Sequence, residues 1–355
     1  MFTLLARSLV DTSRKAATAP AIIGRGSCLD PWLSFSYQGI INVMMRTRLN
    51  KTMSGLTVGA LVLGCTLATT GNADVTTISN CKQDYELCLD AWKDDRLAFL
   101  KSDAGYLNLA GLYWLKEGTN SFGGGAGNDI VFPGKAESSI GTFTLSDGEV
   151  RLAVKPEVDV RHMDRPVNHL LMAGESVKDG IVATHGDLAW TVINRDNRFA
   201  VRLRDFDSPV VKNFPPIEYY PVSATNRVSA KLHLYEKPRT IRVETVIEGL
   251  NYNPWSPGVV KFEIDGETFE LEAYDAGGEL FFVFGDQTSG RGSYPAGRFL
   301  YAKKPDANGV TELDFNTAHS PPCAYNEFAT CPIASARNRI ATRITAGERY
   351  DPAHH

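Results

Sequence analysis

One segment near the N-terminal side of this chain has apolar residues every three or four positions, as an amphipathic helix does. The segment runs from residue 84 to residue 102, and charged residues fill the positions between the apolar ones. The apolar residues with this spacing are Tyr85, Leu89, Trp92, Phe99 and Leu100. This period predicts a helix over residues 84–102, and Gly105 is a suitable stop signal.

After this segment, short runs rich in β-branched and aromatic residues dominate the chain, with turn residues between them. The predicted strands are Thr142–Leu145, Glu149–Val154, Leu188–Asn194, Phe199–Asp205, Val228–Tyr235, Thr240–Ile247, Val259–Ile264, Thr268–Ala273, Glu279–Phe284, Arg298–Tyr301 and Thr311–Phe315. Asp265-Gly266 predicts a two-residue hairpin. With no internal repeat and no linker, the pattern predicts a single mainly β domain over residues 84–350, a sandwich or barrel with an N-terminal helix.

The first 73 residues have a different character. Residues 1–44 mix Arg, Ser and Pro with short apolar pieces, and we interpret them as an over-extended or disordered leader. Residues 45–73 begin with a basic stretch and continue with an apolar run from Leu56 to Leu67, which is the layout of a secretory signal peptide. The run is shorter than the roughly 20 apolar residues that span a bilayer. An organelle transit peptide is the alternative.

Two routes of export fit this leader. Val62-Leu63-Gly64-Cys65 resembles the lipobox of bacterial lipoproteins, in which the cysteine is lipidated, and ordinary cleavage after Ala73 is the other route. Both predict an exported protein, located in the periplasm or anchored to the outer membrane as a lipoprotein. A lipid at Cys65 is then the only expected contact with a membrane. Disulfides persist in such an oxidising space.

Charge and cysteine content narrow the class of partner. The net charge of −4 gives no reason to expect nucleic acid as a partner. Cys81 and Cys88 lie seven positions apart, and Cys323 and Cys331 lie eight apart, so in an exported protein these four are disulfide candidates. Pairing between the two sets is an open alternative. The spacing is not that of a zinc site and no histidine flanks it closely, so no metal is predicted.

The candidate ligand site lies in the C-terminal block, where acids, amides, arginine and aromatics are concentrated. The predicted ligand-binding residues are Asp286, Tyr294, Arg298, Asp314 and Asn316. An arginine that enters a sheet, as Arg298 does, pairs with a carboxylate or holds an anion, and Asp286, Asp314 and Glu348 are its candidate partners. Asp314 and Asn316 would share one face of a strand. His319 is either a base or a solvated loop residue, and the solvated state is favoured.

Several segments resemble the bacterial and archaeal family called domain of unknown function 1684. The resemblance is carried by Gly111–Leu115, Gly118–Gly123, Asn128–Ile130, Val201–Asp205 and the block from residue 280 to 348, which includes Pro321-Pro322-Cys323-Ala324 and Thr330-Cys331-Pro332. It covers about residues 90–350. The family has no settled activity, so the resemblance implies no catalytic residues and no cofactor.

The first hypothesis for function is an exported protein that binds a small polar or anionic ligand through the C-terminal Asp/Arg/Asn block. The chain has no metalloprotease, serine-hydrolase or dinucleotide-binding motif. One alternative is a hydrolase that uses Asp286 or Asp314 as acid or base, with Arg298 holding the substrate. The other is a structural envelope lipoprotein. Catalytic residues and cofactor stay undefined at this point.

Overall fold

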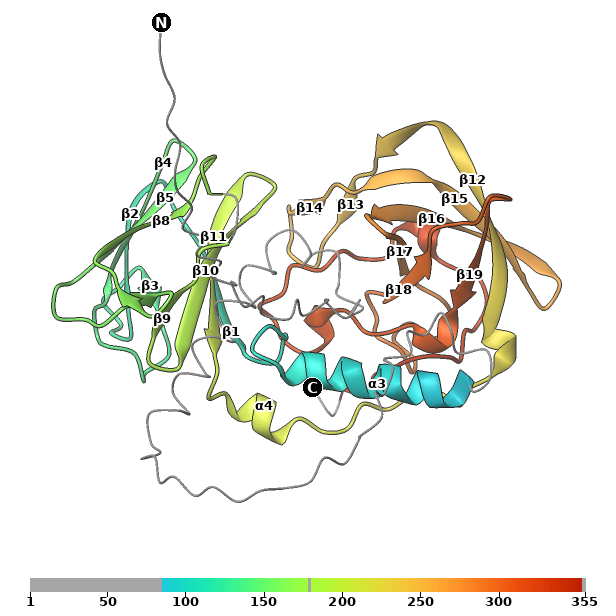
Figure 1. Ribbon diagram of the computed structural model, residues 1–355, viewed down its shortest axis with the longest axis horizontal. Helices are drawn as coiled ribbons and strands as arrows, with labels where there is room; N and C mark the ends of the chain where they lie inside the picture. Colours follow the sequence, from blue (N-terminus) through green and yellow to red (C-terminus); the bar gives the residue numbers. More distant parts are fainter. Residues whose placement is uncertain (1–84, 178–179, 353–355) are drawn as a thin grey trace, which may run out of the picture.

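The computed structural model describes residues 85–177 and 180–352, and the strands within them form two β-rich lobes (Figure 1). We call residues 109–205 the N-terminal lobe and residues 227–348 the C-terminal lobe. The prediction of a mainly β fold with an N-terminal helix is confirmed. That residues 84–350 are a single domain stays a prediction.

Within residues 85–177 and 180–352, helices and short 3-10 turns are few. They are α3 (Tyr85–Lys101), α4 (Pro209–Asn213), η2 (Ala224–Asn226), η3 (Phe315–Thr317), η4 (Pro322–Ala324) and η5 (Ala336–Asn338). The helix predicted over residues 84–102 is α3, and it buries Leu89, Trp92 and Leu100. Figure 1 shows α3 lying along the C-terminal lobe, with its C-terminal end toward β1. No helix of the described residues has the length and apolar composition to cross a membrane.

The N-terminal lobe consists of two sheets around one core. Its strands are β1 (Leu109–Trp114), β2 (Gly118–Gly123), β3 (Ile130–Val131), β4 (Gly141–Ser146), β5 (Glu149–Val154), β6 (Arg161–His162), β7 (Arg165–Pro166), β8 (His169–Ala173), β9 (Ala183–His185), β10 (Leu188–Arg195) and β11 (Arg198–Asp205). The strand orders are β1-β11-β10-β9-β6-β7 and β3-β2-β4-β5-β8. Phe122, Phe143 and Trp190 are buried in the core between them. Alternating residues of each strand point to that core.

The C-terminal lobe is a nearly closed, barrel-like sheet. Its strands are β12 (Arg227–Thr240), β13 (Val243–Glu244), β14 (Asn251–Tyr252), β15 (Trp255–Ile264), β16 (Glu267–Ala276), β17 (Glu279–Phe284), β18 (Arg298–Lys303) and β19 (Val310–Asp314). The order in the sheet is β18-β17-β16-β15-β12-β19, and β13 pairs with β14 apart from it. The predicted hairpin at Asp265-Gly266 is confirmed, because Ile264 pairs with Glu267 and both turn residues have positive φ.

The uninterrupted apolar sequence of β17 follows from burial of both its faces. Leu280, Phe282 and Phe284 point into the barrel core. Phe281 and Val283 point outward and are covered by a second cluster that includes Cys331. A strand with two covered faces reads as a continuous hydrophobic run. The segment from residue 329 to 334 is therefore part of the fold's packing.

Some strand predictions were wrong in extent. The chain from Thr240 to Ile247 does not form one strand: β12 ends at Thr240 after an irregularity between Leu234 and Arg239, where Pro238 has no N–H to donate. β1 was missed, because Gly111 lowers its strand propensity. The register of β1 against β11 shifts between Leu109 and Gly111, so this glycine marks a bulge.

Candidate functional site

Asp286 and Arg298 form a buried ion pair at the ends of β17 and β18. The Arg298 side chain is 1% exposed, and its Nη2 lies 3.5 Å from Asp286 Oδ1. Arg298 also donates to the carbonyl oxygens of Ala346 and, at 3.0 Å, of Ile344. Asp286 Oδ2 accepts from the Ile344 N–H at 2.6 Å. Both charged groups are thus occupied in holding the backbone of residues 344–346 against the barrel.

Burial and the neighbouring charge act in opposite directions on the pKa of Arg298. Desolvation lowers the pKa of the Arg298 guanidinium, and the nearby charge of Asp286 opposes that change. The Asp286 carboxylate accepts from the Thr288 hydroxyl at 2.7 Å as well. Asp286 and Arg298 are partners, as the sequence indicated. With all these bonds made inside the protein, they form a structural clamp on the C-terminal segment.

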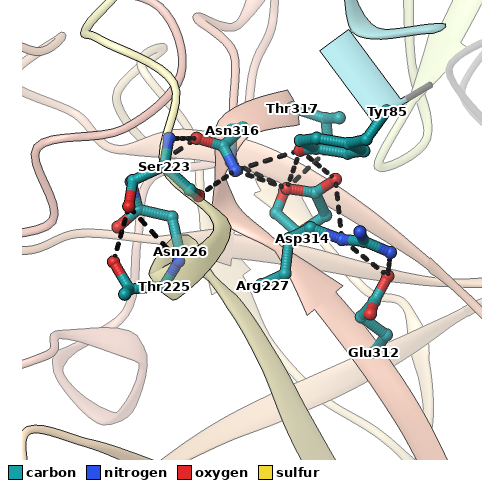
Figure 2. A network of polar contacts seen from close by, with 9 residues as sticks. All are labelled: Tyr85, Ser223, Thr225, Asn226, Arg227, Glu312, Asp314, Asn316 and Thr317. Carbon is teal, nitrogen blue, oxygen red and sulfur yellow. Dashed lines mark hydrogen bonds and ion pairs between the residues drawn. The ribbon is translucent and has the colours of Figure 1, made fainter.

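Asp314 and Asn316 belong to a separate polar network, which includes Tyr85 and Ser223 (Figure 2). Tyr85 Oη donates to Asp314 at 2.7 Å, and Asn316 Nδ2 donates to Tyr85 Oη at 3.0 Å. Asn316 also donates to the Ser223 carbonyl oxygen at 2.9 Å and accepts from the Ser223 N–H at 3.2 Å. The network ties the first residue of α3 to the barrel.

The prediction that Asp314 and Asn316 share one face of a strand was wrong. β19 ends at Asp314, whose carboxylate accepts from the Asn316 N–H at 3.1 Å and caps η3. Burial raises the pKa of Asp314, although hydrogen bonds from Tyr85 and Asn316 and the charge of Arg227 oppose the shift. The Arg227 guanidinium lies 3.9 Å away and stacks over the Tyr85 ring.

Tyr294 lies apart from both groups, beside the cysteine pair. Its hydroxyl donates to the Cys323 carbonyl oxygen at 3.1 Å, and its ring meets that of Tyr350 edge to face. Cys323 and Cys331 are adjacent but are thiols, so the predicted disulfide between them is not formed in this structure. The predicted Cys81–Cys88 pairing involves residue 81, outside the described residues, and stays a prediction, as does lipidation of Cys65.

The five predicted ligand-binding residues therefore occupy three separate places. Asp286 with Arg298, Asp314 with Asn316, and Tyr294 each contact different protein groups. None of the five is among the residues that line the two best-formed cavities in the described part of the chain. That these five residues bind a ligand stays a prediction.

Glu348 has a different partner from the one the sequence suggested. It pairs with Arg96 of α3 rather than with Arg298, and its side chain is fully buried. Its second oxygen accepts from the Ser320 N–H at 2.7 Å and from the Tyr325 hydroxyl at 2.6 Å. Burial alone would raise the pKa of Glu348, but the charge of Arg96 holds this pKa below its ordinary value. Nothing in the polar face of the predicted helix marked Arg96 as buried.

His319 is enclosed by this network and is not the solvated loop residue that was favoured. Burial lowers the pKa of His319 to about 3, so the ring is neutral near pH 7. Its Nδ1 lies 3.0 Å from the Thr317 carbonyl oxygen, and its ring stacks on Tyr301 with centroids 5.9 Å apart. Trp92 packs against it from α3. A neutral histidine packed among aromatic rings is part of the core.

The larger concave site lies between the two lobes and was not predicted. It is a cavity of about 40 Å³. Its lining residues are Tyr106, Leu109, Arg195, Arg202, Phe299, Pro322, Ala329, Thr330, Cys331 and Pro332. No Asp or Glu is among these described lining residues, whereas two arginines are.

Strand alternation places both arginines on the side of β10 and β11 that faces away from the N-terminal core. Val201 and Leu203 of β11 point into that core, so Arg202 and Arg204 point out of it. On β10, Trp190 points into the N-terminal core, so Arg195, five residues later, points out of it. Figure 1 shows β1, β10 and β11 as the N-terminal strands nearest the C-terminal lobe. The C-terminal lobe contributes Phe299 and residues 329–332 as the opposite wall.

The signal for this site was present in the sequence but ambiguous. Arg202 and Arg204 alternate with Val201 and Leu203, the pattern of a strand with one solvated face. In the structure that face is covered, since Arg202 is 9% exposed and Arg204 is 3% exposed. Arg204 donates to the Gly105 carbonyl oxygen and to Asn108 Oδ1. Only the packing of the second lobe shows that this strand face is covered and not solvated.

The fold and this site define a two-lobed, mainly β protein with a basic cavity between its lobes. Residues 212–349 match the family described as "Protein of unknown function (DUF1684)", and the chain belongs to this family. The match covers the C-terminal lobe and does not extend to the segments between residues 111 and 205 that also carried the resemblance.

The solved structures that are similar to parts of the chain include the following two. One is the NMR structure of an uncharacterised protein from Haloarcula marismortui, with 30% identity over 41% of this chain and 83% of that one, at a TM-score of 0.35. The other is a structure from a study of phosphothreonine-dependent FHA domain interactions, with 16% identity over 26% of this chain and 92% of that one, at a TM-score of 0.19. Among curated proteins, none matches the chain.

Proposed function

We propose that this protein binds a small oxyanion or carboxylate in the cavity between its lobes. The observation that carries the proposal is the pair of arginines from adjacent strands, Arg195 and Arg202, whose side chains line the same small cavity. Guanidinium groups match carboxylate and phosphate oxygens with paired N–H donors. Thr330 adds a hydroxyl to the same lining.

The size of the cavity limits the ligand. A volume of roughly 10–15 Å³ on this scale holds one water molecule, so about 40 Å³ holds about three. A tetrahedral oxyanion or a short carboxylate fits this space, whereas a nucleotide does not. The apolar part of the wall, from Leu109, Phe299 and Pro332, lowers the local polarity and so strengthens the attraction between an anion and the arginines.

The proposal keeps an anionic ligand but moves it out of the C-terminal Asp/Arg/Asn block. Arg298 already donates to Ala346, Ile344 and Asp286, so its donors are directed at protein oxygens. The carboxylates of Asp286 and Asp314 accept hydrogen bonds from neighbouring protein groups and line neither cavity. No geometric feature favours either carboxylate as the acid or base of a hydrolase.

Arg202→Gln is expected to weaken binding of the preferred anion roughly 10- to 150-fold, because a charge-assisted hydrogen bond contributes about 1.5–3 kcal/mol. The measurement is isothermal titration calorimetry of the full chain with inorganic phosphate, sulfate and acetate at low ionic strength. The matched control is Arg198→Gln on the same face of β11, where Arg198 is exposed and stacks over Trp114. The control should bind like the wild type.

Three results would overturn the proposal. They are no binding of any of the three anions, equal affinity in Arg202→Gln and the wild type, and an equal loss in Arg198→Gln. A melting temperature recorded for each variant separates lost binding from lost folding.

We also propose that the protein is exported, on the strength of the basic start and apolar run within residues 45–73. The mature chain would lie in the periplasm or carry a lipid at Cys65. The intact mass of the protein is measured in envelope and cytoplasmic fractions. Cleavage before Cys65 should remove the first 64 residues, and cleavage after Ala73 should remove the first 73. A full-length chain found in the cytoplasm would contradict export.

A further inference from the structure

Cys323 and Cys331 lie against one another at the edge of the cavity. Cys323 belongs to η4, and its backbone N–H donates to Cys331 Sγ at 3.2 Å. Cys331 is 5% exposed and lines the cavity, whereas Cys323 is half-buried. Both are in the thiol form. Anion binding gives no role to this pair of neighbouring cysteines.

The backbone on both sides of the pair is fixed. The Cys331 carbonyl oxygen accepts from the Val246 N–H at 2.9 Å, and Pro332 forms a β-bridge with Thr245. On the other side, Tyr294 Oη donates to the Cys323 carbonyl oxygen at 3.1 Å. The fold therefore holds the Cys331 sulfur atom against the backbone of Cys323, an arrangement that favours closure of a bond between the two side chains.

The two thiols differ in reactivity. Cys331 is the largest influence on Cys323 and lowers the pKa of the Cys323 thiol against the effect of burial. The nearby Tyr294 hydroxyl, which donates to the Cys323 carbonyl oxygen, acts in the same direction. A lowered pKa increases the thiolate fraction, and the thiolate is the nucleophile. Cys323 is also the more exposed of the two. Cys323 is thus the attacking sulfur and Cys331 the resolving one.

We propose that Cys323 and Cys331 form a redox-active dithiol that is oxidised by low-molecular-weight disulfides. The Cys323 thiolate attacks one sulfur of a disulfide RSSR, whose S–S bond breaks as the mixed disulfide forms, and the released RS⁻ takes up the proton that Cys323 lost. Cys331 then attacks Cys323 Sγ, and the second RS⁻ leaves and takes the Cys331 proton. The protein loses two electrons and two protons, and RSSR becomes two RSH.

The test is oxidation of the reduced full chain with oxidised glutathione, followed by alkylation of remaining thiols and tryptic digestion. Residues 304–337 form one tryptic peptide that contains both cysteines and no other. In the wild type this peptide is expected to become two hydrogens lighter. In Cys331→Ala it should instead carry glutathione on Cys323, and in Cys323→Ala it should carry neither modification.

Tyr294→Phe tests the positioning of the attacking thiol. Without the Tyr294 hydroxyl, the pKa of Cys323 should rise, so the pH profile of the oxidation rate should shift to higher pH. A change in stability alone would not move this profile. An unshifted profile would overturn the role of Tyr294.

The wild-type measurement needs no variant and decides the proposal. If the peptide stays reduced in the folded protein under conditions that oxidise it in the denatured protein, the pair is not redox-active. If Cys323→Ala traps glutathione on Cys331 at the wild-type rate, the order of attack is wrong. Loss of anion binding in Arg202→Gln has no bearing on either result, so the two proposals fail separately.

Discussion

Glu348→Ala is expected to lower the free energy of unfolding by about 3–5 kcal/mol, because it leaves the charge of Arg96 buried without its carboxylate. Glu348 is fully buried and accepts from Arg96, Ser320 and Tyr325. The pair joins α3 to the last segment of the chain, so the loss should appear as a large drop in the denaturation midpoint. Urea unfolding followed by fluorescence and circular dichroism measures it.

The matched control is Glu218→Ala, which removes an ion pair with Arg349, 3.0 Å long, at half-exposed side chains. Exposed pairs contribute about 0–1 kcal/mol, so this variant should unfold nearly as the wild type does. Equal destabilisation in the two variants would show that the buried Arg96–Glu348 pair contributes no more to the free energy of unfolding than an exposed pair does.

The same pair predicts a dependence on pH. The folded-state pKa of Glu348 lies below its ordinary value of 4.5, so the stabilisation from this carboxylate is complete above that value. It is lost as the pH falls through the lower, folded-state pKa. The difference in stability between the wild type and Glu348→Gln should therefore shrink on the acid side. A difference that grows there would contradict the ion pair.

Arg298→Ala is the second large effect, with an expected loss of about 3–5 kcal/mol in the free energy of unfolding. The substitution leaves Asp286 without its cation and two backbone carbonyl oxygens without their donor. The released segment contains Ile344 and Ala346, both packed in the barrel core. Differential scanning calorimetry measures the loss, and Arg291→Ala, an exposed arginine of the same connection, is the control.

This prediction separates two interpretations of Arg298. If Arg298 were a ligand-binding residue, Arg298→Ala would keep the stability of the wild type and lose anion affinity. The structural clamp instead predicts lost stability, with anion affinity unchanged in whatever fraction of the variant remains folded. If Arg298→Ala is as stable as the wild type and no longer binds phosphate, the anion-binding site lies in the C-terminal Asp/Arg/Asn block.

Local patterns made some elements of this fold predictable. The helical period predicts α3 nearly to its ends, and Asp265-Gly266 predicts the turn between β15 and β16. Both elements depend on residues that are close in sequence. β1 was not predictable in the same way. Gly111 opposes strand formation locally, and only pairing with β11 overrides it.

The site was less predictable, because its parts meet only through tertiary packing. Arg96 and Glu348 are 252 residues apart, and nothing in either local pattern identifies the other. Arg202 alternates with apolar residues in the way that solvated strand residues do, so its burial between lobes is invisible without the second lobe. The sequence identifies charged residues well, but it does not show which of them already bond to other protein groups.

The most direct test of the central claim is a crystal structure of the protein with selenate, a stand-in for sulfate whose selenium is located by anomalous scattering. Anion binding between the lobes predicts a selenium peak in the cavity, with selenate oxygens about 2.7–3.2 Å from guanidinium nitrogens of Arg195 or Arg202. A cavity without selenium, or peaks only at exposed side chains outside it, would contradict the claim.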